Sequence, residues 1–252
     1  MPYLFATARH SDADYAAGRV FYSLPGHPAF PVRLASEIFQ RCLALREAEG
    51  LTAPCVLYDP CCGGAYHLAT LAYLHGERIA SIAASDIDAD ALALAQRNLE
   101  LLTLPGLERR IAGLEALWTA YGKTSHAEAL ASAGRLRERL VALTEHHCVA
   151  VTLFQADALD ETDISGVLDE GSVDIVLTDV PYNRLSAWQG EPAFDPLGQM
   201  LEALRPVLAP GAVVAIASDK GQTPAHAAYR RADRFQIGRR RIVLLRPVLS
   251  TD

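Results

Sequence analysis

The sequence contains no uninterrupted apolar run of the roughly 20 residues that a membrane-spanning helix requires, so no membrane span is expected. The N-terminus also lacks a charged start followed by a long apolar stretch, so no secretory signal is expected. Cysteine is scarce: there are five, and the adjacent Cys61 and Cys62 have no second pair at metal-ligand spacing. These absences predict reduced thiols, no metal site and a cytoplasmic protein.

Positive charge is in short supply overall but is concentrated near the C-terminus. The formal net charge is −7, yet residues 220–246 carry eight basic residues and one acid. A basic patch on an acidic body can steer RNA; a solvated, solubilising surface is the alternative. Arg33 is a further candidate, because a cation in the first turn of a helix opposes the helix dipole, although it could simply face solvent. The candidate RNA-binding residues are Arg33, Lys220, Arg239, Arg240 and Arg241.

The apolar pattern predicts an α/β fold with a mostly parallel, doubly wound sheet. Continuous apolar runs, typical of strands buried on both faces, occupy residues 55–59, 79–85, 150–155, 173–178 and 212–217. Helical spacing of apolar residues separates most of them, with further helices expected at 196–208 and 223–230. The last two strands, 235–237 and 241–245, have only three residues between them, which predicts an antiparallel hairpin.

The chain is expected to form a single domain over residues 21–252, preceded by a flexible N-terminus at residues 1–20. Between residues 107 and 147 the alternation of strand and helix stops, and the sequence reads as helix only, with a break at Gly122. This stretch is a helical insertion, either a substrate-gripping element or a structural prop.

The stretch CVLYDPCCGGAY, residues 55–66, reads as a strand that runs into a tight glycine turn at a helix N-terminus. Glycine allows the backbone to approach a ligand, and the first turn of the helix offers free N–H donors. An ordinary strand–turn–helix joint is the alternative. No GxGxxG pattern is present, since Gly63 and Gly64 are followed by Ala65, which argues against a nicotinamide dinucleotide.

Four expected strands end at or near an acid: Asp59, Asp86, Asp157 and Asp179. The carboxyl ends of parallel strands lie along one edge of the sheet, so these carboxylates should surround one crevice. They would repel a diphosphate but suit a cofactor with hydroxyls, amines and a positive charge, and S-adenosylmethionine fits. In that role Asp86 would hold the ribose, Asp157 the adenine amine, and Asp59 would order the turn or meet an ammonium group. The candidate cofactor-binding residues are Asp59, Pro60, Cys61, Gly63, Gly64, Asp86, Ile87, Asp157 and Ala158.

The sequence TDVPYN, residues 178–183, resembles the Asp/Asn-Pro-Pro-Tyr signature of amino-group methyltransferases, with Val180 in place of the first proline. In that signature the acid or its neighbouring carbonyls accept hydrogen bonds from the target nitrogen, and the aromatic ring stacks on a planar base. A turn cap for the acid and a core position for the aromatic are the alternatives. The candidate catalytic residues are Asp179, Pro181, Tyr182 and Asn183.

Beyond these sites, most of the chain resembles the AviRa family of rRNA methyltransferases, which confer resistance to the orthosomycin antibiotic avilamycin. The resemblance is carried by PGHPAFPVRLASEIFQR, DPCCGGAYHLATLAYLH, ASDIDADALALAQRNL, GRLRERL and VLTDVPYN. It implies a Rossmann-like, class I methyltransferase domain that uses S-adenosylmethionine. It further implies a guanine of 23S rRNA, at ring nitrogen N1, as the target. The expected partner is 23S rRNA or the large ribosomal subunit, and a monomer is expected.

Two positions depart from the family pattern. The family has Gly-Ser-Gly where this chain has Gly63, Gly64 and Ala65, and Pro-Tyr-Gly where it has Pro181, Tyr182 and Asn183. Ala65 should permit close approach of a ligand if its φ is negative, and Asn183 tolerates a left-handed backbone. The rival functions are a methyltransferase of another base, a protein or a small molecule, and a non-catalytic RNA-binding protein on the same fold.

Overall fold

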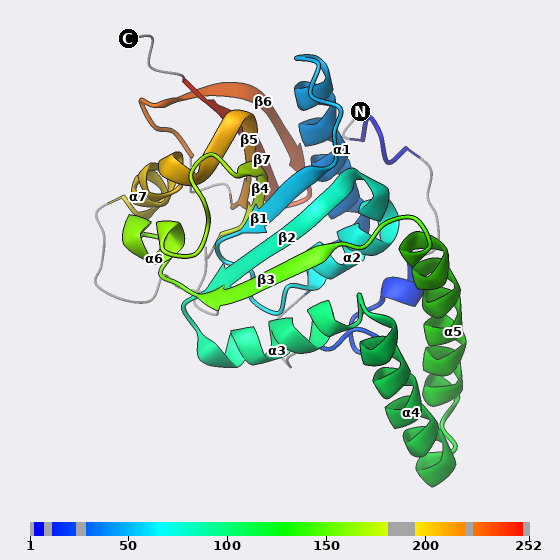
Figure 1. The fold of residues 1–252 in the computed structure, drawn as a ribbon. Coiled ribbons are helices and arrows are strands. Elements are labelled where there is room, and N and C mark those ends of the chain that lie inside the picture. The colour runs from blue at the N-terminus through cyan, green and yellow to red at the C-terminus, as the bar shows by residue number, and fades with distance from the viewer. Residues whose placement is uncertain (1–2, 8–11, 24–28, 181–194, 220–223, 249–252) are drawn as a thin grey trace.

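In the computed structural model, one twisted sheet with helices on both faces forms the body of the protein (Figure 1). The structure describes residues 3–7, 12–23, 29–180, 195–219 and 224–248. Within them the strands are β1 Cys55–Asp59, β2 Ile79–Asp86, β3 Ala150–Gln155, β4 Val173–Asp179, β5 Leu208–Ser218, β6 Tyr229–Ile237 and β7 Arg240–Pro247. The α-helices are α1 Val32–Glu47, α2 Tyr66–His75, α3 Ala89–Glu100, α4 Leu104–Tyr121, α5 Thr124–Thr144, α6 Glu161–Ser165 and α7 Pro196–Ala203. The 3-10 turns are η1 Ala13–Tyr15, η2 Gly76–Arg78 and η3 Arg205–Val207.

The strand order β3-β2-β1-β4-β5-β7-β6 confirms the predicted doubly wound sheet. The first five strands in this order pair in parallel, and β7 pairs antiparallel with both β5 and β6, as the short connection predicted. The chain runs outward from β1 in one direction and from β4 in the other. In a sheet of this kind a ligand crevice opens where the order reverses, beyond the carboxyl ends of β1 and β4.

Alternate residues of the central strands face two separate apolar cores. Leu57 of β1 packs in the core that α1, α2 and α3 cover, whereas Tyr58 packs with Met200 and Leu201 of α7 on the other face. Both faces are therefore buried, which explains why the strand sequences are apolar without a break. No helix in the described part of the chain is both long enough and apolar enough to cross a membrane.

The helical insertion is a hairpin of α4 and α5 that extends away from the sheet (Figure 1). Gly122 ends α4 with a φ of +58°, so the break falls at the predicted residue. The helix begins at Leu104, a few residues earlier than expected, because Thr103 caps it by accepting a hydrogen bond from the Gly106 amide.

The N-terminal segment makes more contacts than its polar, aperiodic sequence indicated. The backbone amides of Leu4, Phe5 and Ala6 all donate to the carboxylate of Glu37 in α1, at 2.7–2.9 Å. Farther along, Tyr15 is 4% exposed and packs in the main core. The described part of residues 1–20 is therefore held against the domain by a buried charge and an aromatic side chain.

The second difference from the sequence prediction lies just before the C-terminal hairpin. A helix was expected at residues 223–230, but residues 224–228 contain no helix and β6 begins at Tyr229. β6 pairs with β7 along its length, from Tyr229 opposite Pro247 to Ile237 opposite Arg240. The ladder satisfies the backbone of a strand in which four of the nine side chains are charged, so the strand has no apolar signature.

Candidate functional site

The carboxyl ends of β1, β2 and β4 bring Asp59, Asp86 and Asp179 to one edge of the sheet. Asp157 lies two residues beyond the end of β3, in the loop before α6, rather than at the strand end itself. The four predicted acids thus follow adjacent strands, β3-β2-β1-β4, as the sequence pattern indicated.

The glycine turn is tied to β2 through Asp86. The Gly63 amide donates to Asp86 Oδ2 at 2.8 Å, and the Asp88 amide donates to Oδ1 at 3.0 Å. Burial raises the pKa of Asp86 and these backbone hydrogen bonds oppose that rise, with a net upward shift. Gly63 has a φ of +52°, and a Cβ there would meet nothing within 4 Å. The backbone therefore borders open space beside a carboxylate, as a ligand-binding turn requires.

Gly64 serves packing between elements instead. A Cβ at this position would lie 2.6 Å from Leu94 Cδ2 of α3, so a larger residue would force that leucine side chain to move. The buried Asn98 of α3 donates to the carbonyls of both Gly64 and Tyr22, at 2.8 and 3.1 Å. Asn98 was not predicted as a site residue. The sequence does offer a sign of this role, because Asn98 is a polar residue on the apolar face of the helix predicted over residues 92–102.

Ala65 was expected to permit close approach of a ligand if its φ was negative, and its φ is not negative. Its φ is +50°, and it is the single non-glycine residue with positive φ in the described part of the chain. An L-residue in this left-handed region costs about 1–2 kcal/mol. The side chain is fully buried, and the Ala65 amide donates to Cys62 O at 2.7 Å, which holds the turn in this conformation.

Asp59 orders the turn from within the protein. It is fully buried; its Oδ1 accepts from the Cys61 amide at 3.0 Å, and its Oδ2 lies 3.0 Å from His67 Nε2. Of the two roles considered for Asp59, ordering the turn is the one whose contacts the structure displays. Burial lowers the pKa of His67, but the hydrogen bond and charge of Asp59 outweigh it and leave that pKa raised. His67 was missed because a lone histidine on an apolar helix resembles a core residue.

Asp179, the acid of the signature sequence, forms an ion pair with Arg240 of β7, with 3.2 Å between Oδ2 and Nη2. The other oxygen, Oδ1, is buried and has no hydrogen-bond partner among the described residues. Burial raises the pKa of Asp179, and the charges of Arg240 and His67 only partly offset this. The guanidinium of Arg240 lies 4.9 Å from the Phe30 ring centroid.

The remaining cofactor-binding candidates follow the carboxyl ends of β2 and β3. Asp157 Oδ1 accepts from the Leu159 amide at 2.9 Å, and Ala158 is buried. The Ile87 carbonyl accepts from the Gln155 side chain at 2.9 Å.

Pro60 and Cys61 complete the predicted cofactor set in the loop after β1. The Pro60 carbonyl accepts from the hydroxyl of Ser85 at 3.5 Å. Burial, with the nearby charges of Asp59 and Asp86, raises the pKa of the Cys61 thiol well above its usual value, so the thiol stays neutral and unreactive. In the described residues, no group of three His, Cys, Asp or Glu side chains could hold a metal ion.

The predicted basic residues that the structure describes have different surroundings. Arg240 turns to Asp179, whereas Arg239 is exposed at the turn between β6 and β7, with Arg241 in β7 beside it. Arg33 donates to the Ala6 and Thr7 carbonyls at 2.8 and 3.0 Å, which gives it a role in holding the N-terminal segment. Lys220, Pro181, Tyr182 and Asn183 lie outside the described residues.

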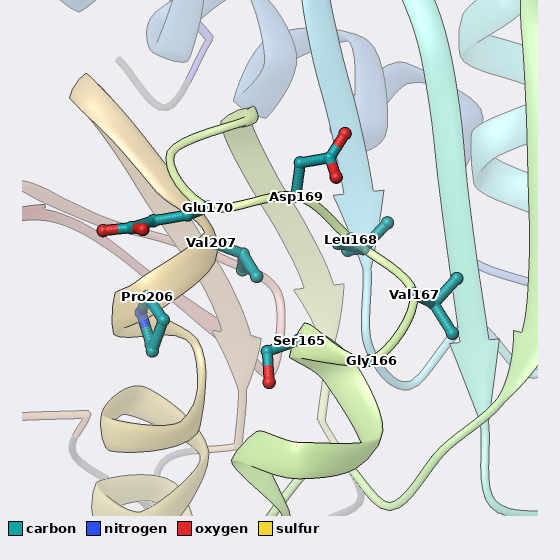
Figure 2. Close-up of a pocket in the computed structure, with 8 residues that line it drawn as sticks. All are labelled: Ser165, Gly166, Val167, Leu168, Asp169, Glu170, Pro206 and Val207. Atoms are coloured by element: carbon teal, nitrogen blue, oxygen red, sulfur yellow. The ribbon is translucent and has the colours of Figure 1, made fainter.

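A hollow of about 320 Å³ lies at the opposite edge of the sheet, between α6 and η3 (Figure 2). Its walls come from residues 165–170, which lead toward β4, and from Pro206 and Val207, which precede β5. It therefore opens at the amino ends of these strands. None of the four strand-end acids lines this hollow, so it is separate from the candidate site.

Comparison with known proteins gives matches over nearly the whole chain. The sequence model of the family described as rRNA methyltransferase AviRa matches residues 1–240. A 23S rRNA (guanine(2535)-N(1))-methyltransferase of Streptomyces viridochromogenes is 40% identical over 244 residues, which are 97% of this chain and 95% of the relative. The solved structure of the rRNA methyltransferase aviRa from Streptomyces viridochromogenes has a TM-score of 0.86 at 38% identity, covering 97% of this chain and 96% of that one. TrmN from Thermus thermophilus, at 17% identity, 88% and 50% coverage and a TM-score of 0.51, shares the fold alone.

Proposed function

Because the chain belongs to the AviRa family of rRNA methyltransferases, we propose that it methylates ring nitrogen N1 of a guanine in 23S rRNA, with S-adenosylmethionine as methyl donor. The observation that carries the proposal is Asp179. Its Oδ1 is buried without a partner among the described residues, and Oδ2 is held by Arg240. It is the last residue of β4, which pairs with β1, the strand that enters the glycine turn.

The residues around the turn suit a nucleoside cofactor that carries a positive charge. Asp86 and Asp157 each keep acceptor capacity beyond their backbone hydrogen bonds, since a carboxylate offers about four lone pairs. Gly63 borders open space, and its amide is already bonded to Asp86, an acid that would repel a diphosphate. We assign the ribose to Asp86, the adenine to Asp157 and Ala158, and the amino-acid end to the turn. When bound, this cofactor supplies a methyl group on a positively charged sulfur.

The target nitrogen of guanine carries a proton and is a poor nucleophile while it does. Asp179 is placed to accept that proton through Oδ1, because its other oxygen is already occupied by Arg240. A base in a helical stack cannot reach a carboxylate inside the sheet edge, so the guanine has to leave its stack first. Tyr182, three residues beyond, would stack on the displaced base. In proteins that bind single strands, such stacking contributes about 1–3 kcal/mol of binding free energy per base.

Replacement of Asp179 tests the assignment. Asp179→Asn keeps the shape of the side chain but cannot accept a proton, so methyl transfer should fall by about 10²–10⁴-fold while cofactor affinity stays within a few-fold. The assay is transfer of tritiated methyl to 23S rRNA from a strain without the gene, with primer extension to locate the modified base and calorimetry for the cofactor. Asp90→Asn, an exposed acid at the start of α3, is the matched control. Normal turnover in Asp179→Asn would rule out this role.

RNA as the substrate has its own test at the hairpin. Arg239 is exposed, so Arg239→Gln should weaken rRNA binding at low salt and reduce the slope of log K against log salt by about 1. An unchanged slope would favour a methyltransferase of a protein or small molecule. Resistance to an orthosomycin stays a prediction, and the inhibitory concentration of avilamycin in a susceptible strain that expresses the protein measures it.

A further inference from the structure

Four ionisable side chains from four elements, two acids and two bases, form two pairs near the carboxyl ends of β1 and β4: Asp59 of β1 with His67 of α2, and Asp179 of β4 with Arg240 of β7. The contact within each pair is direct. Asp59 Oδ2 lies 3.0 Å from His67 Nε2, and Asp179 Oδ2 lies 3.2 Å from Arg240 Nη2. Between the two pairs, His67 Nε2 lies 3.4 Å from the carbonyl of Leu177, two residues before Asp179 in β4, so the imidazole is within electrostatic range of that carboxylate.

His67 is enclosed on every side that the structure describes. Its side chain is 7% exposed, its Nε2 lies 3.4 Å from the Leu177 carbonyl of β4, and its ring centroid is 5.6 Å from that of Phe30. The charged groups that face it are Asp59 and Asp179, both acids. A buried histidine between two carboxylates is stabilised in its protonated form.

The environment of Asp179 works against its charged form, because burial raises its pKa and so favours the neutral acid. A neutral carboxylic acid cannot accept the proton of guanine N1. The groups that favour the charged form are Arg240 and His67, whereas Asp59 opposes it. Arg240 is 20% exposed and lies near the protein surface, so His67 is the more deeply buried of the two cations.

We propose that His67 is a positioning residue for methyl transfer: held protonated by Asp59, it keeps Asp179 ionised and ready to accept the substrate proton. The inference rests on the proposed function above. It assigns to His67 an electrostatic role and no contact with substrate. It also links the two halves of the site, because the carboxylate that orders the glycine turn also fixes the charge beside the catalytic acid.

The pH dependence of methyl transfer tests the proposal. His67→Gln retains a hydrogen-bond donor toward Asp59 but has no charge, so the acid limb of the kcat profile should move to higher pH by about 1–2 units. The rate at the alkaline plateau should stay within about three-fold of wild type. His75→Gln is the matched control: it makes the same substitution at the other end of α2, where the ring contacts the Ser36 hydroxyl rather than the carboxylate of Asp59. A uniform loss of rate in His67→Gln with no movement of the acid limb would overturn the proposal.

A second measurement needs no variant. In the full-length protein labelled with ¹⁵N-histidine, the nitrogen shifts of the His67 ring should be those of the protonated form at pH 7. A neutral ring at pH 7 would overturn the proposal even if every variant folded poorly. The two hypotheses fail in different ways: wild-type protein that transfers no methyl to rRNA refutes the proposed function. Active wild-type protein with a neutral His67 refutes only this inference.

Discussion

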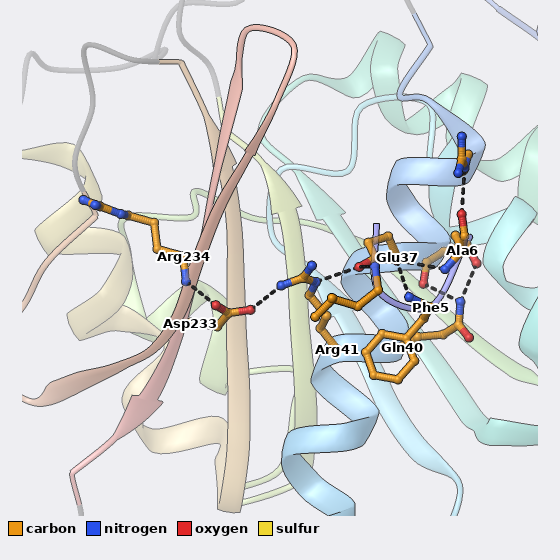
Figure 3. Close-up of polar contacts among 10 residues, drawn as sticks. Phe5, Ala6, Glu37, Gln40, Arg41, Asp233 and Arg234 are labelled. Carbon is orange, nitrogen blue, oxygen red and sulfur yellow. Dashed lines mark hydrogen bonds and ion pairs between the residues drawn. The ribbon is translucent and has the colours of Figure 1, made fainter. Parts of the chain in front are cut away.

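Glu37 offers a sharp test of how a buried charge holds the N-terminal segment. The side chain is fully buried in α1, and its carboxylate accepts the amides of Leu4, Phe5 and Ala6 together with Nε of Arg41 (Figure 3). Glu37→Gln keeps the size of the side chain and removes the charge. It also replaces one acceptor oxygen by an NH₂ group, which cannot accept.

The magnitude follows from how the four donors divide between the two oxygens. Leu4 and Arg41 donate to Oε1, and Phe5 and Ala6 donate to Oε2, so either orientation of a glutamine amide loses two hydrogen bonds. A hydrogen bond to a charged group contributes about 1.5–3 kcal/mol. Arg41 keeps its ion pair with Asp233, so the loss should fall at the low end, about 3 kcal/mol of unfolding free energy.

The pH dependence gives the same test a second reading. Burial raises the pKa of Glu37, but the backbone hydrogen bonds and that of Arg41 outweigh burial and leave the pKa below its usual value. A carboxyl group whose pKa is lowered in the folded state stabilises the protein above its unfolded pKa, about 4.5, and less as the pH falls through the folded value. The wild type should therefore lose part of its advantage over Glu37→Gln below about pH 4.5.

Urea unfolding of the full chain at pH 7 measures the change, and hydrogen exchange of the amides of residues 4–6 shows where it arises. Glu47→Gln is the matched control on the same helix, because Glu47 pairs with Arg78 in solvent and an exposed pair contributes at most about 1 kcal/mol. If Glu37→Gln cost no more than this control and left those amides equally protected, the burial reasoning would be refuted.

Three further perturbations have defined outcomes. Gly64→Ala should weaken cofactor binding by about ten-fold in calorimetry and destabilise the fold by about 1–3 kcal/mol, because its Cβ would meet Leu94 at 2.6 Å; Gly134→Ala in α5 meets nothing and should be neutral or stabilising. Burial lowers the pKa of His75 to about 4, so the unfolded chain binds the extra proton. Stability should fall as pH drops from about 6.5 to 4, and His75→Gln should flatten this dependence in thermal unfolding. Asn98→Ala should raise the KM for cofactor more than it lowers kcat, since the turn loses an anchor while Asp179 keeps its contacts; an unchanged KM would contradict this.

The central strands were predictable because they are buried on both faces, and a parallel strand of this kind is an unbroken apolar run; β3, at the edge of the sheet, carries the same apolar pattern although its residues are exposed or half-buried. Residues 55–59 and 79–85 match β1 and β2 almost to the residue. β6 was not predictable in the same way. It forms the edge of the sheet, its sequence is rich in charge, and the backbone ladder to β7 rather than apolar burial stabilises it.

The acids of the site were predictable from strand ends, but their partners were not. Asp59 and Asp179 follow directly from the strand pattern. Arg240 is 61 residues from its partner Asp179, and their contact depends on β7 pairing antiparallel with β5. The contact between His67 and Asp59 depends on how α2 packs against the sheet. The positive φ of Ala65 was also invisible, because alanine carries no sequence signal for a left-handed turn.

The network around Arg41 joins the two ends of the chain. Arg41 pairs with Glu37 in α1 and, across 192 residues of sequence, with Asp233 in β6. During synthesis the helix leaves the ribosome long before its second acidic partner exists. Burial of this arginine can be completed only when nearly the whole chain has been translated. A truncation just before residue 233 removes the Asp233 carboxylate from this network, so the N-terminal segment, which shares it through Glu37, should be cut more readily by proteases.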